Sequence, residues 1–212
     1  MTSVAVGLSR DLAAKRVMRA EVQGYDIAVW RDENGGLHAW NNRCPHRGMR
    51  LSHGFVRDGH LACLYHGWHF RKDGGCAYIP AHPELEPPET ISATVFSITE
   101  NAGVIWVSAT DTAKAPAEDG EWEPLRSLSF ACPPEKVRHA IENTPFAGQL
   151  PERAASGHLT AGSTALLVHC APLGDAETLA HLLVAAGTSL AGRKALSRWC
   201  ETARESAEAG PA

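Results

Sequence analysis

Two short segments, each with one cysteine and one histidine, constrain this chain more than any other feature of its sequence. Residues 44–46 read Cys-Pro-His and, after sixteen intervening residues, residues 63–66 read Cys-Leu-Tyr-His. Thiolate sulfur and imidazole nitrogen are ligands of zinc, copper and iron–sulfur centres. Two such loops can clamp a metal group from opposite sides. The spacing therefore predicts a metal centre with the ligands Cys44, His46, Cys63 and His66.

Two kinds of metal group suit two cysteines and two histidines. A Rieske-type [2Fe–2S] cluster takes two Cys thiolates on one iron and two His imidazoles on the other. The thiolates stabilise the iron that stays ferric, and the neutral imidazoles make the other iron easier to reduce. Zinc is the alternative, but zinc fingers place Cys close to Cys and His close to His. The mixed segments therefore favour the [2Fe–2S] cluster, and zinc stays open.

The residues around both segments carry a family resemblance. They read Cys-Pro-His-Arg-Gly at 44–48, Leu-Ser-His-Gly at 51–54 and Cys-Leu-Tyr-His-Gly-Trp-His-Phe at 63–70, with further matches within 75–80 and 100–107. With these stretches the chain resembles, over about residues 4–108, the Rieske domain of the Rieske non-haem iron oxygenases, a ring-hydroxylating and demethylating family. Leu64 is a departure, because many relatives carry Pro there, but it does not alter the ligands.

The resemblance also implies how the cluster is tuned. Mitochondrial-type Rieske proteins carry an extra cysteine in each cluster loop, and neither loop of this chain has one. This favours the oxygenase or ferredoxin branch, at the low end of the roughly −150 to +300 mV range of Rieske centres. Gly48 and Gly67 are expected to let backbone amides approach the cluster sulfurs. Trp68 is expected either to shield the cluster or to be an ordinary core residue.

The composition is that of a folded chain without a bias toward nucleic acid. The 212 residues are 44% hydrophobic and 21% charged, with a formal net charge of −4. These values argue against nucleic-acid and anionic-membrane partners. No apolar run approaches the roughly 20 residues that cross a bilayer, and residues 1–19 lack the apolar stretch of a secretory signal, so a cytoplasmic location is expected. The sequence contains neither Gly-x-Ser-x-Gly nor Gly-x-Gly-x-x-Gly, so hydrolase chemistry and nicotinamide or flavin binding are not indicated.

The first half of the chain reads as short strands separated by glycine-bearing turns. Tyr25–Arg31 is rich in β-forming residues, and Phe55–Arg57 is followed by Asp58-Gly59 and then His60–Ala62, a strong hairpin pattern. Such repetition is typical of a small antiparallel sandwich or barrel. A stretch dominated by Ala, Thr, Asp, Pro and Gly follows. The expected organisation is a Rieske domain over residues 1–109, a linker over 110–120 and a second region over 121–212.

The second region combines strands with a final helix. The apolar runs Thr164–Cys170 and Thr178–Val184 flank a turn and predict a hairpin. With Thr188 or Ser189 as N-cap, a helical apolar face then follows at Leu196, Trp199, Cys200, Ala203 and Ala207. The predicted fold class is mainly β: an antiparallel Rieske-type domain followed by a small α+β region that ends in an amphipathic helix. The remaining cysteines are expected to be buried thiols, namely Cys76, Cys132, Cys170 and Cys200.

The resemblance implies a second iron site for which this chain lacks the usual spacing. Full-length members of the family carry a large second domain, where two closely spaced histidines and one carboxylate hold a mononuclear iron. Residues 121–212 are therefore interpreted as a shortened remnant of that domain. A hairpin could set two histidines opposite each other with Glu142 or Asp175 as the carboxylate, but isolated strand histidines are favoured. Beyond the linker, successive histidines are 19, 11 and 12 residues apart: His139, His158, His169 and His181.

Three functions are consistent with these features. The first is an electron-transfer component of a multicomponent oxygenase. It would take one electron from a reductase or ferredoxin and pass it to a mononuclear iron on a partner oxygenase subunit, for hydroxylation or oxidative demethylation. The second is a compact, self-sufficient oxygenase with an unrecognised iron site, and the third is a redox-sensing or structural subunit. The histidine spacing favours the first, so the chain is not expected to be a complete enzyme alone.

The expected partners are proteins. Several arginines surround the cluster segments in the sequence. They form either a basic rim that attracts an acidic reductase or a solvated or locally paired set, and the second interpretation is favoured. Trimers are common in the family, so an oligomer is also considered. The arginines are Arg43, Arg47, Arg50, Arg57 and Arg71.

Overall fold

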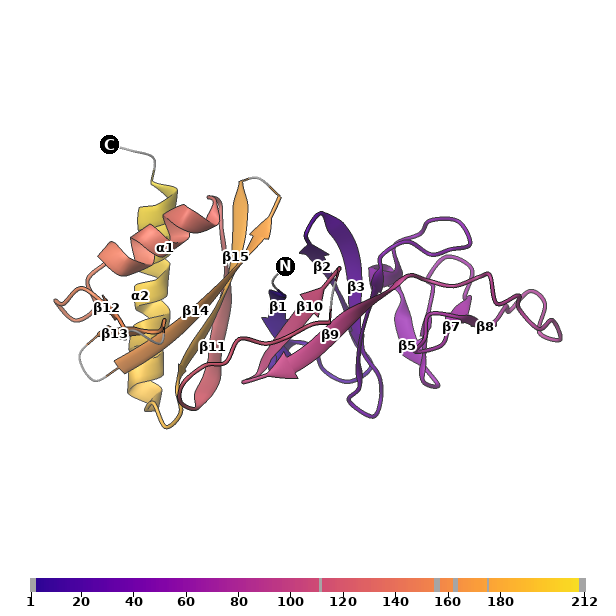
Figure 1. The fold of residues 1–212 in the computed structure, drawn as a ribbon, viewed down its shortest axis with the longest axis horizontal. Helices are drawn as coiled ribbons and strands as arrows, with labels where there is room; N and C mark the ends of the chain where they lie inside the picture. The colour runs from indigo at the N-terminus through magenta and orange to yellow at the C-terminus, as the bar shows by residue number, and fades with distance from the viewer. Residues whose placement is uncertain (1–2, 111, 155–156, 162–163, 175, 210–212) are drawn as a thin grey trace. The chain divides into compact units, whose positions relative to one another are not determined.

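Two units make up the chain, and both Cys-His segments lie in the first. The computed structural model describes residues 3–110, 112–154, 157–161, 164–174 and 176–209. The first unit comprises Met1–Glu100 and Ile105–Ala115, and the second comprises Asn101–Val104 and Pro116–Ala212. Figure 1 follows the chain through both units, from indigo to yellow. The boundaries expected at residues 109 and 121 stay a prediction.

The first unit contains two sheets. The larger holds β1 (Val4–Leu8), β2 (Val17–Val22), β3 (Tyr25–Arg31), β4 (Leu37–Asn41), β9 (Val95–Asn101) and β10 (Val104–Ser108), in the order β1-β10-β9-β4-β3-β2. The smaller holds β5 (Phe55–Arg57), β6 (His60–Ala62), β7 (His69–Phe70) and β8 (Cys76–Tyr78), paired antiparallel in chain order. Two 3-10 turns complete the unit, at Ser9–Asp11 and Leu51–His53. The predicted strands at 25–31, 55–57 and 60–62 are confirmed.

Aromatic side chains form the core next to the candidate ligands. Trp30 and Trp40 meet edge to face with ring centroids 5.0 Å apart, and Trp40 and Phe70 do so at 6.5 Å. All three are fully buried. They belong to the same hydrophobic cluster as Cys44 and Cys63. The core of the first unit therefore extends to the two thiols and keeps water away from them.

A buried carboxylate fixes the turn between β3 and β4. Asp32 is 1% exposed and accepts hydrogen bonds from the N–H groups of Asn34 and Gly36. Its Oδ2 lies 3.1 Å from Nε2 of His38 and 2.5 Å from Nζ of Lys72, which belongs to the turn between β7 and β8. Burial raises the pKa of Asp32, but the hydrogen bonds from Lys72, His38 and the backbone outweigh it, so the pKa lies well below its usual range. The contact ties the turn of the larger sheet to the smaller sheet.

The second unit is an antiparallel sheet with two helices on one side, as Figure 1 shows. Its strands are β11 (Trp122–Phe130), β12 (Glu152–Arg153), β13 (Leu159–Ala161), β14 (Thr164–Leu173) and β15 (Glu177–Ala185), in the order β11-β15-β14-β13-β12. The helices are α1 (Pro134–Asn143) and α2 (Leu190–Glu208). The predicted fold class, mainly β with a final helix, is confirmed.

The predicted hairpin and the predicted C-terminal helix are both present. β14 and β15 pair from Leu166 and Val184 to Leu173 and Glu177. β14 begins where the predicted run does and continues to Leu173, and β15 is one residue longer than its predicted run at each end. Asp175, on which the predicted hairpin was centred, lies outside the described residues. Ser189 is the N-cap of α2, and its Oγ accepts the N–H of Gly192 at 3.2 Å. The buried face of α2 is the predicted one: Leu196, Trp199, Cys200, Ala203 and Ala207.

The short helix α1 was not predicted. Pro133 precedes it and Pro134 opens it, a position where the missing N–H costs nothing. Its buried residues are Val137, Ala140 and Ile141, which pack on the sheet. Ten residues give only a brief helical period, and the two prolines read as a turn. The helix forms because the sheet covers its apolar side.

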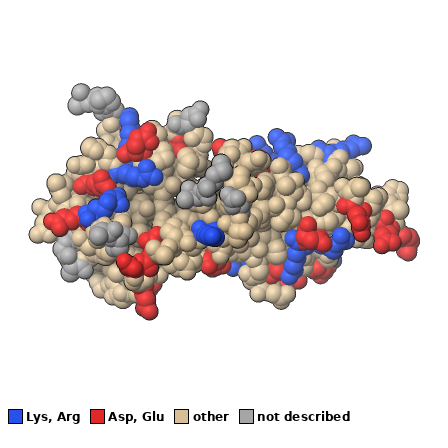
Figure 2. Space-filling view, in the orientation of Figure 1, with Lys and Arg blue, Asp and Glu red and all other residues tan. Residues whose placement is uncertain are grey.

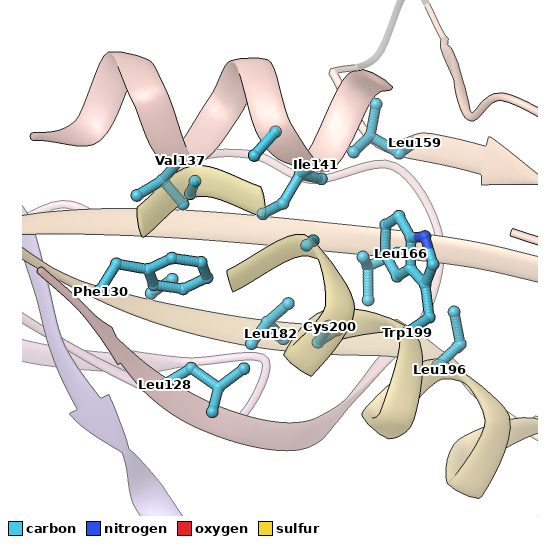
Figure 3. Close-up of a cluster of buried hydrophobic side chains, with 14 of the residues drawn as sticks. Leu128, Phe130, Val137, Ile141, Leu159, Leu166, Leu182, Leu196, Trp199 and Cys200 are labelled. Carbon is cyan, nitrogen blue, oxygen red and sulfur yellow. The ribbon is translucent and has the colours of Figure 1, made fainter. Parts of the chain in front are cut away.

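Alternate residues of β15 separate the two faces of this sheet. Leu182 belongs to the core beneath the helices, and Figure 3 shows it beside Cys200 of α2. Successive side chains in a strand point to opposite faces. His181 therefore points away from the helices. This division decides which residues of the second unit can meet at one site.

The burial of the remaining cysteines was predicted correctly except at one position. Cys76, Cys132 and Cys200 are buried, whereas Cys170 is only partly buried. The reason is strand pairing: β13 pairs with β14 only as far as Leu166, so the stretch around Cys170 lies on an open edge. Within the ranges described, no helix combines the length and the apolar character needed to cross a membrane.

Candidate metal centre

The two Cys-His segments form loops with the same backbone hydrogen bonds. In the first loop, the N–H of Cys44 donates to the carbonyl five residues on, and the N–H of Gly48 donates to the carbonyl of Cys44, both at 2.8 Å. In the second, Cys63 and Gly67 make the same two bonds at 2.9 Å. Gly48 and Gly67 adopt φ values of +70° and +67°, which glycine tolerates best. The glycine amides therefore close the two loops.

The two thiols lie next to each other inside the unit. Cys44 and Cys63 are 3% and 2% exposed, and the thiol of Cys63 is in hydrogen-bonding contact with that of Cys44. Burial raises the pKa of Cys44 to about 11, and the neighbouring Cys63 adds to the rise. The backbone N–H groups of His46 and Arg47 donate to the Cys44 sulfur and oppose it. A metal cation between the sulfurs would supply the positive charge that two adjacent thiolates need.

The two imidazoles lie together nearer the surface. The rings of His46 and His66 have centroids 4.7 Å apart, and both side chains are partly exposed. Burial lowers the pKa of His46, and the charges of His66 and Arg47 lower it further. These effects favour the neutral imidazole, which is the form that binds a metal.

This arrangement fits a Rieske cluster. The thiols form one pair on the core side and the imidazoles form another on the solvent side, as one iron with two Cys and one iron with two His require. Over the part of the chain that the structure describes, no three His, Cys, Asp or Glu side chains gather to hold a single metal ion. The assignment of the four residues as ligands remains a prediction.

Aromatic rings cover both imidazoles. Trp68 stacks on His46 with centroids 4.0 Å apart and planes 8° apart. Trp68 is partly buried and also packs against the hydrophobic core around the two cysteines, so its position is compatible with both of its predicted roles. Tyr65 lies against His66 with centroids 3.8 Å apart. Leu64 and Tyr65 are 56% and 62% exposed, so the second loop presents an apolar tip to solvent.

Asn42 supports the first loop, a role that the sequence analysis did not predict. Its side chain is fully buried; Oδ1 accepts the N–H of Ser52 at 2.7 Å and Nδ2 donates to Asp26 Oδ1 at 2.9 Å. Its backbone carbonyl accepts the N–H of Leu51, on the far side of the loop. Asn42 therefore joins the two ends of the loop to β3. A polar residue directly after the apolar strand Leu37–Asn41 was the available signal.

Most of the arginines near the site are paired locally, as the favoured interpretation holds. Arg50, Arg57 and Arg71 lie within 3.3–3.7 Å of Asp side chains. Arg43 donates to the carbonyl of Gly48 at 3.3 Å. Figure 2 shows basic and acidic side chains interspersed over much of the face drawn. Such exposed pairs contribute little stability.

The histidines of the second unit lie at separate positions except for one pair. His169 and His181 face each other across β14 and β15, as the hairpin predicted. His181 Nδ1 lies 2.8 Å from Ser127 Oγ, and burial lowers the pKa of His169 to about 4. His139 contacts Asn143 on α1, and the ring of His158 lies 5.3 Å from that of Trp122.

The structure does not assemble the alternative iron site with Glu142. That carboxylate is on α1, which covers the core side of the sheet, whereas His169 and His181 point to the other side. Glu142 is instead paired with Arg153, whose Nε lies 2.9 Å from its Oε1. Asp175, the other carboxylate considered, lies outside the described residues.

Known proteins match the first unit in sequence, and solved structures match nearly the whole chain in fold. A family model described as "Rieske [2Fe-2S] domain" matches residues 2–94. Oxidoreductase NdmD of Pseudomonas putida is 39% identical over 104 residues, which are 49% of this chain and 18% of that protein. The 4beta-methylsterol monooxygenase of Methylococcus capsulatus is 42% identical over 108 residues, 49% of this chain and 29% of the relative. The chain thus spans less than a third of the length of either relative.

Among solved structures, Pseudomonas putida CBB5 NdmA matches with a TM-score of 0.76 at 17% identity, covering 99% of this chain and 81% of that chain. At this identity the likeness concerns the fold. The sequence matches cover the first unit, which also holds the two Cys-His loops, and both observations point to the same kind of metal centre. Residues 2–94 therefore form a Rieske [2Fe–2S] domain, whose cofactor is a Rieske-type [2Fe–2S] cluster, and this domain is similar to those of the Rieske non-haem iron oxygenases.

Proposed function

We propose that Cys44 and Cys63 bind one iron of the cluster and that His46 and His66 bind the other. The observation that carries this assignment is the sorting of the donors into a buried, adjacent thiol pair and an outer imidazole pair with centroids 4.7 Å apart. The equivalent backbone hydrogen bonds of the two loops support the assignment, because they give both loops the same backbone conformation around the cysteine and the histidine.

Residues around the four proposed ligands adjust the charge on the cluster, exclude water from it and provide a path for the electron. When bound, the cluster accepts and releases one electron at a time. The amides of His46 and Arg47 stabilise negative charge on the Cys44 sulfur. Trp68 covers the face of His46 and excludes water from it. His66 is partly exposed beside Tyr65 at the tip of the second loop, where its imidazole can pass the electron to a docked partner.

We further propose that the chain is an electron-transfer component of a multicomponent oxygenase. It takes one electron from a reductase or ferredoxin and passes it to a mononuclear iron on a partner oxygenase subunit. The proposal is supported by the outer position of the imidazoles and by the separation of Glu142 from His169 and His181 in the second unit. The exposed Leu64 and Tyr65 suit a partner with an apolar contact surface beside the second loop.

Iron counting combined with electron paramagnetic resonance tests this function. The full chain is purified anaerobically, iron and acid-labile sulfide are measured, and the spectrum is recorded after reduction with dithionite. We expect about two irons and about two sulfides per chain, with a Rieske signal. A third iron per chain would contradict the electron-transfer role and indicate a complete oxygenase. Zinc in place of iron, with no visible absorbance, would overturn the cluster itself.

A further inference from the structure

Two histidines lie close together on one face of the smaller sheet, and the proposed electron transfer assigns no role to either. His60 begins β6 and His69 begins β7, and Ala62 lies directly opposite His69 in the register of the two strands. Residues two positions apart along a strand share a face, so His60 and His69 are diagonal neighbours. The other face carries Leu61 and Phe70, which are fully buried.

The separation of the two rings fits one metal ion between them. Their centroids are 6.1 Å apart, and their planes are inclined by 44°. A zinc–imidazole bond of ~2.0–2.1 Å places the ion about 3.2 Å from the ring centroid. Two imidazoles on one ion then have centroids about 5.2 Å apart in a tetrahedral arrangement and about 6.3 Å apart when they are opposed. The observed separation lies within this range.

Both rings are accessible and in a form that can bind a metal. His60 and His69 are partly exposed, and over the residues described their ring nitrogens make no hydrogen bond or ion pair. Burial lowers the pKa of His69, and the charges of His60 and Arg57 lower it further, whereas the charge of Asp58 raises it. The net effect favours the neutral imidazole, which is the form that binds a metal.

The surroundings orient one ring and leave space beside the other. Tyr78 on β8 meets the ring of His69 edge to face, with centroids 5.5 Å apart. An open hollow of about 410 Å³ borders His60, with Asp58 and Asp73 on its rim. The hollow can hold the water molecules that complete the coordination of an ion with two protein ligands.

The cationic side chains around His60 do not exclude a metal ion, because each has a carboxylate partner. Such pairing reduces the repulsion that a bound cation would meet. The pairs are Arg57 with Asp58, Arg71 with Asp73 and Lys72 with Asp32.

We propose that His60 and His69 together bind one divalent transition-metal cation of the Zn²⁺ and Cu²⁺ class, with water as the remaining ligands. Imidazole nitrogen suits these ions, whereas Mg²⁺ and Ca²⁺ prefer oxygen ligands. Two protein ligands make the ion exchangeable rather than permanently bound. Neither histidine is among the four proposed cluster ligands, so the proposal holds or fails separately from the electron-transfer role.

The ion would join the two strands that flank the second cluster loop. β6 ends at Ala62, directly before Cys63, and β7 begins at His69, directly after Trp68. One ligand from each strand ties the strands together at the base of the loop. A cation that binds only the folded arrangement stabilises it, so the bound ion should slow the loss of the cluster.

Zn²⁺ is the probe, titrated calorimetrically into the cluster-loaded full chain near neutral pH in a buffer that does not bind zinc. His60→Gln and His69→Gln should each weaken Zn²⁺ binding at least about tenfold, since each removes one of two protein ligands. The visible spectrum shows whether each variant keeps its cluster, and if one variant loses it, the other decides. His82→Gln is the matched control, because His82 is an exposed histidine outside both the pair and the cluster loops, and it should leave binding unchanged.

Unchanged Zn²⁺ binding by either variant, or no saturable binding by the unchanged protein up to about 1 mM Zn²⁺, would overturn the proposal. Two ions per chain, one lost with each histidine, would show that the rings bind separately and would overturn the shared site. Saturating Zn²⁺ should slow bleaching of the cluster in air at least about twofold in the unchanged protein but not in His60→Gln. Equal bleaching with and without Zn²⁺ would overturn the stabilisation of the loop.

Discussion

The rings of His46 and Trp68 stack almost in parallel, with centroids 4.0 Å apart, although they belong to different cluster loops. The contact covers one face of a candidate iron ligand and joins the loops on their outer side. Replacing Trp68 by Ala should therefore make the cluster bleach several-fold faster in air. Because Trp68 is only partly buried, the free energy of unfolding should fall by about 2 kcal/mol, less than the ~3–5 kcal/mol of a fully buried aromatic residue.

Visible circular dichroism during exposure to air measures this effect. Trp68→Phe keeps an aromatic ring over His46 and should bleach at nearly the rate of the unchanged protein. Equal bleaching of the Ala and Phe variants would show that the ring does not protect the cluster.

Cys44→Ser and Cys63→Ser should each abolish the cluster. A serine oxygen is a poor substitute for thiolate at an iron–sulfur centre. Cys76→Ser is the control, because Cys76 is equally buried in the same hydrophobic cluster but lies outside both loops. Its visible spectrum should persist. A normal spectrum from either loop variant would refute the assignment of that cysteine as a ligand.

Gly48→Ala and Gly67→Ala should both destabilise the cluster loops, but by different amounts. A non-glycine residue at positive φ costs roughly 1–2 kcal/mol. A Cβ at Gly48 would meet nothing within 4 Å, whereas at Gly67 it would lie 3.1 Å from Cγ of Pro80. Gly67→Ala should therefore have the larger effect. Urea unfolding followed by cluster absorbance measures both, and the opposite ranking would contradict the loop geometry described above.

The pKa of Asp32 predicts a pH dependence of stability. The folded pKa lies below the unfolded value of about 3.9, so the ionised carboxylate stabilises the fold above that value, and this contribution is lost as pH falls below it. Asp32→Asn should cost about 2–3 kcal/mol near neutral pH, because it leaves Lys72 without its buried partner. The variant should also lose stability less steeply below pH ~4.

Urea midpoints by far-ultraviolet circular dichroism, measured across the acid range, test this dependence. Asp58→Asn serves as control, since the side chain of Asp58 is 80% exposed. If Asp32→Asn and the unchanged protein lost stability in parallel on acidification, Asp32 would not be responsible for that loss.

Trp199→Ala should destabilise the second unit by about 3–5 kcal/mol. Trp199 is 7% exposed, packs edge to face on Phe146 and donates from Nε1 to the carbonyl of Thr144 at 3.0 Å. Trp199→Phe keeps most of the packing and should lose only about 1 kcal/mol for the hydrogen bond. Thermal unfolding measures both. An unchanged melting curve for the Ala variant would contradict the burial of this face of α2.

Local patterns made the cluster loops and α2 predictable. A loop such as 44–49 closes through hydrogen bonds between residues four and five positions apart, so its glycine and ligand spacing are visible in the sequence. The face of α2 repeats Leu196, Trp199 and Ala203 at helical spacing. The hairpin register that sets His169 opposite His181 follows from two apolar runs around one short turn.

The remaining features depend on contacts between distant segments. α1 is short, opens at Pro134 directly after Pro133, and is stabilised by packing on the sheet, so its own residues do not predict it. The pocket beside α1 gathers Arg138, Arg153 and Val168 from a helix and two strands. The role of Asn42 depends on Asp26 and Ser52, which lie sixteen residues before it and ten residues after it.

The separate closure of each cluster loop has a consequence for assembly. Each loop is fixed by its own pair of backbone hydrogen bonds and by a glycine already in its required conformation. Because both hydrogen bonds lie within one loop, neither needs iron to form, so incoming iron and sulfide should meet loops that are already closed. Cluster removal by a chelator should accordingly be reversible, with reinsertion rather than refolding as the slow step.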